Sequence, residues 1–292
     1  MNRYVRAFLL SRQADGLTTR SLEWHETSLK SFTRWLEACS HSAEPETWNP
    51  TLIREYVVYL QSSGLSGWTV TNKVQSLLAF TRWLHEEEFT EKNVAERVRK
   101  PKPPQTQRQP FTDAELRRLL KASQSSIRDA AIVALLLDTA IRASELCTLK
   151  LSDCLLDQCL IKVMGKGNKE RVVPHSPQTG KLVSKWLLKG RASEGPYVFH
   201  TERSERFTPR SLHKLIERIG NRAAVDDCYP HRLRHSAAIT MLRNGMDPLT
   251  LQRMLGHTSL NMTMRYVALN TTDLQNAHAV ASPLANLMRN AR

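Results

Sequence analysis

The feature that most constrains this chain is a basic, proline-rich segment from residue 98 to residue 110. It reads VRKPKPPQTQRQP, and its prolines disfavour a helix while it offers no apolar face for a core. We therefore expect an extended linker that could span roughly 35–40 Å at about 3 Å per residue. The linker separates a first domain, residues 1–97, from a second domain, residues 111–292. Its basic residues are candidates for DNA-backbone contacts: Arg99, Lys100, Lys102 and Arg108.

The bulk composition favours a polyanionic partner. The chain has 292 residues, enough for two ordinary domains, and carries a net charge of +14. Nucleic acid is the first candidate and an anionic membrane the second. No apolar run approaches the roughly 20 residues of a spanning helix, and the N-terminus has no signal-peptide pattern. The five cysteines form no C-x-x-C pair, so we expect free thiols in a reducing cytoplasm and no zinc site.

Apolar residues recur at helical spacing through residues 1–97, which predicts a small helical bundle. The stripes are Leu22, Leu29, Phe32, Trp35 and Leu36; Ile53, Val57, Tyr59 and Leu60; and Val70, Val74, Leu77, Leu78, Phe80, Trp83 and Leu84. No cluster of nucleophiles or metal ligands stands out. The basic residues Lys30, Arg34, Lys73 and Arg82 could contact phosphates, although a solvated helix face is the simpler interpretation of each.

The second domain begins with helical signals and then changes to strands. Thr112 and Glu115 form the pattern of a capping box, and an apolar run over residues 130–137 predicts a buried helix. Arg142 directly follows that run. It is either an edge residue or a guanidinium held near the core, and Glu145, three residues on, could hold it.

A β-hairpin is predicted next, with strands at residues 160–164 and 170–174 joined by the glycine-rich turn GKGNK. The turn is not a phosphate-binding P-loop, because G-x-x-x-x-G-K-[ST] is absent. Lys166 and Lys169 are either solvated or directed into a groove. Helix returns over residues 176–229, with Thr208 and Pro209 opening one such helix.

The stretch from residue 230 to residue 269 concentrates chemically useful side chains. Pro230 suits a first helical turn, Gly245 and Gly256 suit helix ends, and Asp247 suits an N-cap. His231 and Arg234 share a helical face, whereas a break near residues 258–259 would let His257 and Tyr266 face one site. The competing interpretation is two amphipathic helices with surface arginines and satisfied histidines.

Taken together, these motifs resemble those of the tyrosine recombinase family. The order is R-x-S-E-L, G-K-G-N-K-x-R-x-V-P, H-x-L-R-H-S, L-G-H and a tyrosine nine residues later. The length is most similar to simple Xer-like members and transposon resolvases. The resemblance implies a mainly α fold with a small β-sheet (α+β): an N-terminal helical core-binding (SAM-like) domain and a C-terminal catalytic domain. One departure is Ala140, where the family usually has glycine; because alanine rarely takes a positive φ, we expect a differently shaped turn before Arg142.

The resemblance also implies the roles of individual residues. It assigns phosphate binding to Arg142, Lys166, His231, Arg234 and His257, with Lys166 also protonating the leaving oxygen, His231 accepting the nucleophile's proton, Tyr266 as the nucleophile and Glu145 as a supporting acid. The activity implied is site-specific DNA recombination through a 3′-phosphotyrosine and a Holliday junction, with no metal, cofactor or ATP.

The implied partners are double-stranded DNA with inverted repeats, a homo-tetramer assembled on it and accessory proteins, in the bacterial cytoplasm at the nucleoid. Three alternatives remain: a type IB topoisomerase, a non-catalytic DNA-binding regulator and an inactive recombinase. Ser282 and Pro283 predict a short helix in the tail. Its apolar stripe would dock either on its own catalytic domain or, as the resemblance favours, on a neighbouring protomer.

Overall fold

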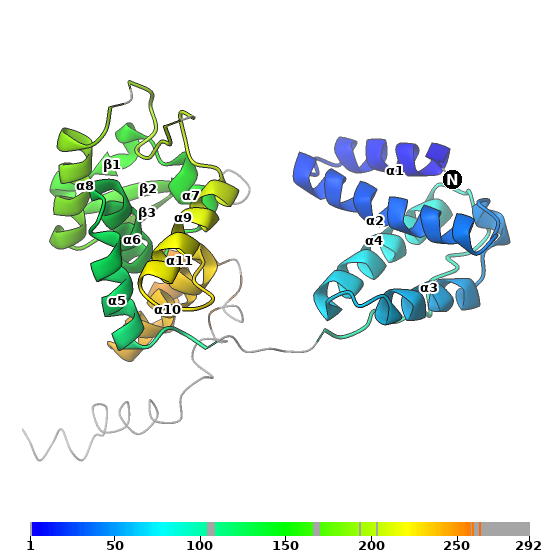
Figure 1. The fold of residues 1–292 in the computed structure, drawn as a ribbon. Coiled ribbons are helices and arrows are strands. Elements are labelled where there is room, and N and C mark those ends of the chain that lie inside the picture. The colour runs from blue at the N-terminus through cyan, green and yellow to red at the C-terminus, as the bar shows by residue number, and fades with distance from the viewer. Residues whose placement is uncertain are drawn as a thin grey trace, which may run out of the picture. The chain divides into compact units, whose positions relative to one another are not determined.

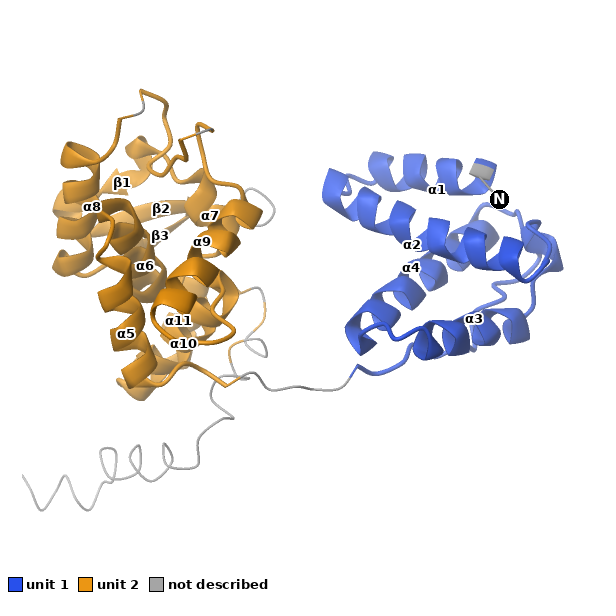
Figure 2. Ribbon diagram, in the orientation of Figure 1, with its two compact units in different colours: residues 1–107 blue, residues 108–292 orange. Residues whose placement is uncertain are grey.

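A computed structural model describes residues 2–103, 109–165, 170–192, 194–202, 204–257, 259 and 263. The chain forms two compact units, residues 1–107 and residues 108–292, which are shown in separate colours in Figure 2. The expected fold class, mainly α with a small β-sheet, is confirmed. In the described part of the chain, no helix combines the length and the apolarity needed to cross a bilayer.

The first unit is helical, and α2 packs against both α1 and α4 (Figure 1). Its helices are α1 (Asn2–Ala14), α2 (Thr19–Ala38), α3 (Pro50–Ser62) and α4 (Gly67–Glu86), with a 3-10 turn at Pro45–Thr47. Side chains of Thr18, Asn49 and Ser66 accept hydrogen bonds from the first turns of α2, α3 and α4. Most residues of the predicted stripes supply the core. The exceptions are Tyr59, which is exposed, and Leu22, which is half-buried outside the core cluster, while Leu78 is partly buried against it.

The linker segment is tied to the first unit over its first residues. Val98 is buried in that unit's core, and the hydroxyl of Thr71 donates to the carbonyl of Pro101 at 2.9 Å. The expectation of a segment without buried apolar side chains therefore does not hold at Val98. Arg99, Lys100 and Lys102 are exposed.

The second unit surrounds a three-stranded antiparallel sheet with helices (Figure 1). Its helices are α5 (Asp113–Ser123), α6 (Ile127–Thr139), α7 (Ala143–Thr148), α8 (Pro177–Lys189), α9 (Pro209–Arg222), α10 (Pro230–Arg243) and α11 (Pro248–Leu255), with 3-10 turns at Leu151–Asp153 and Leu156–Gln158. The strands are β1 (Cys154–Leu155), β2 (Leu160–Met164) and β3 (Glu170–Pro174), in the order β1-β2-β3. The predicted hairpin is therefore confirmed.

Helix ends in this unit follow the predicted signals. Thr112 and Glu115 form the capping box of α5. Pro230 begins α10, and the Asp247 side chain accepts a hydrogen bond from the third residue of α11. Gly256 ends α11 in the left-handed conformation at φ 63°. These local signals place α10 and α11 next to each other, and their contact positions the site described below.

Alternation along the hairpin directs one face of it to the core. Ile161 and Val163 on β2 and Val173 on β3 are buried together. Arg171 lies two residues before Val173 and pairs across the strands with Val163, so the arginine shares this inward face. The guanidinium of Arg171 therefore lies against α11, because α11 packs against β3.

Candidate active site

Three arginines from different parts of the second unit contact the C-terminal end of α11. Three successive carbonyls at its C-terminus each accept a hydrogen bond from one guanidinium. The pairs are Arg171 Nε to Met254 O at 2.9 Å, Arg234 Nη2 to Leu255 O at 2.9 Å, and Arg142 Nη2 to Gly256 O at 3.1 Å. The arginines come from β3, from α10 and from the residue that precedes α7.

This arrangement follows from the electrostatics of a helix end. The last four carbonyls of a helix have no partner within it, and they carry the partial negative charge of the helix dipole. Guanidinium groups are donors only, so they satisfy those carbonyls while the dipole offsets part of their charge. Cations that would otherwise repel one another are therefore held close together.

Glu145 provides the one carboxylate in this cluster among the described residues, and it serves two arginines. Its oxygens lie 2.7 and 2.9 Å from Arg171 Nη1 and Nη2, a two-point pairing, and 2.8 Å from Arg142 Nη1. Glu145 is 3% exposed. Burial alone would raise the pKa of Glu145, but hydrogen bonds from Arg171 and from the backbone N–H of Arg142 lower it overall. The carboxylate is thus ionised and fixes both guanidiniums.

Arg234 is the most deeply placed of the three, with 3% of its surface exposed. Its Nη1 donates to the carbonyl of Ala140 at 2.5 Å. Ala140 adopts the left-handed conformation, φ 49°, at the end of α6. The premise that alanine would avoid a positive φ at this position is therefore wrong. The buried methyl packs in a cluster with Ala237 and Leu251, which offsets part of the strain of a positive φ.

Two histidines adjoin these arginines. His257 directly follows the end of α11, and its Nε2 lies 3.2 Å from Arg234 Nη2. Its Nδ1 lies 2.9 Å from the hydroxyl of Thr263. Burial, and then the charges of nearby cations, first Arg234 and Arg142, lower the pKa of His257 to about 4. His231 is exposed in the first turn of α10, and its charge contributes to the same lowering.

The structure therefore brings together Arg142, Glu145, Arg234 and His257, and it places His231 one turn before Arg234 on α10. Four further predicted residues lie outside the described residues: Lys166, Tyr266, Lys169 and Arg108. The expected break near residues 258–259 and the tail helix also fall largely or wholly outside them.

Two contributors were missed by the sequence reasoning. Arg171 is the arginine of the motif G-K-G-N-K-x-R-x-V-P, and its period-two relation to Val173 indicates a charged side chain on the buried face. Thr263 is fully buried against His257, and no local pattern in the sequence marks it. The contact of Arg171 with Glu145 and that of Thr263 with His257 both depend on the tertiary fold, which brings the first pair together and orients the second.

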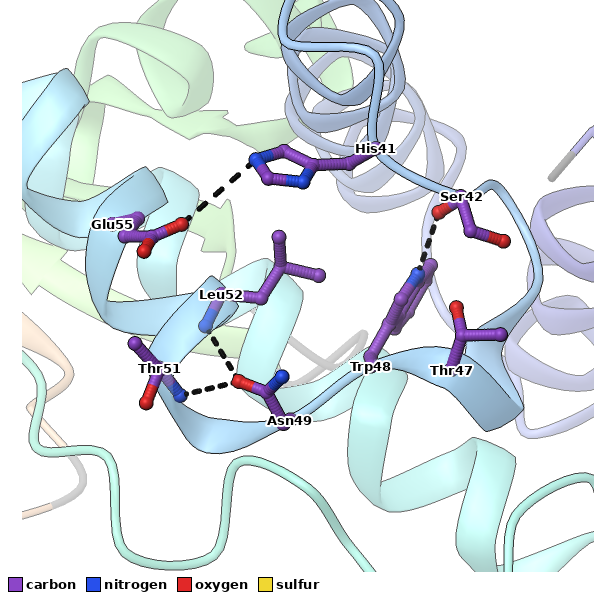
Figure 3. Close-up of a pocket in the computed structure, with 8 residues that line it drawn as sticks. All are labelled: His41, Ser42, Thr47, Trp48, Asn49, Thr51, Leu52 and Glu55. Atoms are coloured by element: carbon purple, nitrogen blue, oxygen red, sulfur yellow. Dashed lines mark hydrogen bonds and ion pairs between the residues drawn. The ribbon is translucent and has the colours of Figure 1, made fainter.

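A hollow of about 310 Å³ in the first unit offers a contrast (Figure 3). Figure 3 shows polar groups of its lining paired with one another: Glu55 lies 3.8 Å from His41, and the indole of Trp48 donates to the backbone carbonyl of Ser42. Its lining includes neither lysine nor arginine, so it has no fixed cation for a phosphate. Within the described residues, no group of three His, Cys, Asp or Glu could hold a metal ion.

Comparisons with known proteins agree with this fold. Residues 109–273, more than half of the chain, match the phage integrase family. The tyrosine recombinase XerA of Pyrococcus furiosus is 34% identical over 240 residues, covering 80% of this chain and 81% of the relative.

Two solved structures share the fold. An integrase of the transposon Tn1549 in complex with a circular intermediate DNA has a TM-score of 0.77 at 18% identity, covering 94% of this chain and 97% of its own. A XerH site-specific recombinase bound to its difH substrate has a TM-score of 0.71 at 21% identity, covering 92% and 82%.

The chain belongs to the phage integrase family of tyrosine recombinases. It is accordingly an enzyme of site-specific DNA recombination, as the motif resemblance predicted. The topoisomerase and regulator alternatives receive no support from these relatives.

Proposed function

We propose that the arginine cluster at the end of α11 binds one phosphodiester of DNA and supports its attack by Tyr266. The observation that carries this is the convergence of three guanidiniums on one helix end, with Glu145 as the one carboxylate among the described residues that pairs with them. Of the two arginines paired with Glu145, Arg142 is one-third exposed and Arg171 only 13%, so Arg142 is the more open to a ligand while Arg171 secures Glu145. Arg142 and Arg234 would hold the non-bridging oxygens and stabilise the five-coordinate transition state.

The remaining steps fall to three titratable groups. A tyrosine with a pKa near 10 is ionised to only about one part in a thousand at pH 7, which corresponds to roughly 4 kcal/mol. His231, exposed at the start of α10, is proposed to accept the proton of Tyr266. His257 donates a hydrogen bond to the phosphate, and Lys166 protonates the leaving 5′-oxygen.

The product of the attack is a 3′-phosphotyrosine, which keeps the energy of the broken bond, so rejoining to another strand requires no ATP. Recombination would then proceed through a Holliday junction. The reaction would take place in a tetramer assembled on two DNA sites, each built from inverted repeats. Accessory proteins would assist it, and it would occur at the nucleoid. A protomer-linking tail after Tyr266 belongs to this proposal.

Further contacts with the DNA backbone are proposed for the first unit and the linker. Lys73 on α4 is partly buried, and desolvation followed by the charge of Arg34 on α2 lowers its pKa. Two like charges held together favour an anion beside them. Arg99, Lys100 and Lys102 are exposed on the linker segment, where they can reach phosphates.

The decisive experiment replaces Tyr266 with phenylalanine. The substrate is a duplex selected for binding from a random-sequence pool, nicked between its two half-sites so that a cleaved complex is trapped. Tyr266→Phe should bind this duplex as well as the unaltered protein does but give no covalent band on a denaturing gel. A covalent band from the variant would reassign the nucleophile, with Tyr229 the next candidate.

Excess EDTA provides a second test, because the proposed charge stabilisation comes from arginines. Cleavage by the unaltered protein should persist in the chelator. Loss of cleavage that returns with added magnesium would contradict the metal-independent mechanism.

A further inference from the structure

A buried hydroxyl stands directly behind His257. Thr263 is 0% exposed, and its Oγ1 lies 2.9 Å from Nδ1 of the imidazole. The ring nitrogen on the other side, Nε2, faces Arg234. Thr263 lies three residues before the proposed nucleophile and carries no charge. Because its hydroxyl contacts the imidazole, its effect on the site would pass through the ring of His257.

The two contacts fix which nitrogen carries the proton. A guanidinium has donors only, so Nε2 must present its lone pair to Arg234. The ring is neutral at pH 7, because burial and the charges of Arg234, Arg142, Arg171 and His231 lower the pKa of His257 to about 4. The single ring proton is therefore on Nδ1, and it is donated to Thr263 Oγ1.

This tautomer is unsuited to the role proposed for His257. Phosphate oxygens accept hydrogen bonds, and a lone pair on Nε2 would repel them. Adding a second proton to the ring is opposed by its burial and by the surrounding cations. Transferring the existing proton from Nδ1 to Nε2 leaves the ring charge unchanged and creates the donor that the phosphate needs.

We propose that Thr263 is a positioning residue for His257. Its hydroxyl keeps the imidazole ring in one orientation while the ring changes from one tautomer to the other. Without DNA the hydroxyl accepts from Nδ1–H. When a phosphate replaces Arg234 beside Nε2, the proton moves to Nε2 by exchange with solvent and the hydroxyl turns to donate to Nδ1. A hydroxyl can do both, and no net proton is gained or lost. The inference rests on the proposed function for the phosphate, but the tautomer of the DNA-free protein does not.

Two substitutions separate the hydroxyl from the bulk of the side chain. Thr263→Val keeps the size but removes the hydroxyl that contacts Nδ1 in both tautomers, so the ring loses the contact that fixes its orientation. Cleavage of the selected, nicked duplex should fall about 10–100-fold with DNA affinity unchanged. Thr263→Ser restores the hydroxyl and should recover most of the rate. Thr179→Val, which removes another buried hydroxyl on α8, controls for generic loss of stability.

Nitrogen-15 NMR of labelled histidine gives the readout that a purely structural role would not change. The signals of His257 are assigned by their loss in His257→Gln. The DNA-free protein should show the proton on Nδ1, and saturating inorganic phosphate, with binding followed by the phosphorus-31 line width, should move it to Nε2. Sodium chloride at equal ionic strength should leave it in place. In Thr263→Val the signals should average between the two forms.

Several results would overturn the inference: a proton on Nε2 in the free protein, a proton that stays on Nδ1 in saturating phosphate, or unchanged cleavage by Thr263→Val. Failure of the proposed function looks different. It would appear as an unaltered protein that cleaves no duplex, while the tautomer of the free protein would still be measured.

Discussion

Gly256 is restricted to glycine by two independent constraints. Its φ is 63°, and a Cβ there would lie 3.1 Å from Cδ, Nε and Cζ of Arg171. Gly256→Ala should therefore lose about 1–2 kcal/mol to backbone strain and in addition displace the arginine that holds Glu145. We expect a lower Tm and a larger loss of cleavage than the stability change explains.

Gly245 supplies the matched control. It has a φ of 93°, and nothing lies within 4 Å of a Cβ built on it. Gly245→Ala should show the strain alone, with cleavage close to normal once the protein is folded. Equal losses of cleavage in both variants would mean that the contact with Arg171 is not important for the site.

His257 should make stability depend on pH. Its pKa is about 4 in the folded protein and near 6.5 when unfolded, so the unfolded chain binds the proton more readily. The stabilising contribution is complete above pH 6.5 and is lost as the pH falls towards 4. The Tm should drop more between pH 7 and pH 5 in the unaltered protein than in His257→Gln. Parallel pH dependences of the two proteins would contradict the lowered pKa. Burial also lowers the pKa of His25, but His25 is present in both proteins, so its effect on the difference in Tm cancels.

At the residue scale, sequence reasoning succeeds where partners are close along the chain. Arg142 and Glu145 are three residues apart, so their pairing follows from helical spacing. The grip of Arg171 on Glu145 spans 26 residues and depends on how β3 packs under α11. Ala140 shows the opposite error. A weak local preference against positive φ was given too much weight, because tertiary contacts hold that turn.

At the scale of elements, α11 acts as a common support for the site. It is eight residues long, and its last carbonyls hold β3, α10 and the start of α7 through one arginine each. Its beginning was readable from Asp247 and Pro248, and its end from Gly256, since caps are local signals. What those signals do not contain is the convergence of three arginines on its end, which requires the packed fold.

Arg171→Lys tests that support. Lysine keeps the charge but cannot pair with both carboxylate oxygens of Glu145 and also reach the carbonyl of Met254. We expect a loss of about 1–3 kcal/mol in unfolding free energy and at least a 10-fold slower cleavage, since Arg142 loses its fixed partner. Urea denaturation and the nicked-duplex assay measure the two effects.

Arg128→Lys is the corresponding control, because Arg128 contacts Asp129 through Nε and Nη2, both at 3.1 Å, outside the cluster. It should lose some stability and keep its cleavage rate. If Arg171→Lys behaves in the same way, the guanidinium supports the fold without tuning the site.

At the scale of the whole molecule, two compact units and a basic segment are proposed to bind one polyanionic ligand. The charge of +14 and the proline-rich segment pointed to DNA and to a division of the chain near residue 100. How the segment attaches is less accessible from the sequence, because the burial of Val98 in the core and the hydrogen bond between Thr71 and Pro101 arise from packing against the first unit. The exposed basic residues of this segment are therefore next to residues that the first unit holds in place, Val98 and Pro101.

If these residues contact the DNA backbone, their removal should weaken binding to all sequences equally. We expect the triple variant Arg99→Gln, Lys100→Gln, Lys102→Gln to retain its Tm and its preferred site while the salt dependence of binding becomes shallower. Each lost phosphate contact lowers the slope of log K against log salt by about 0.9, so three contacts change it by about 2.7. The control removes the same charge from the exposed lysines of α8: Lys181→Gln, Lys185→Gln, Lys189→Gln. An equal change in slope for both triple variants would show that only the total charge matters, and that the linker does not lie against the duplex.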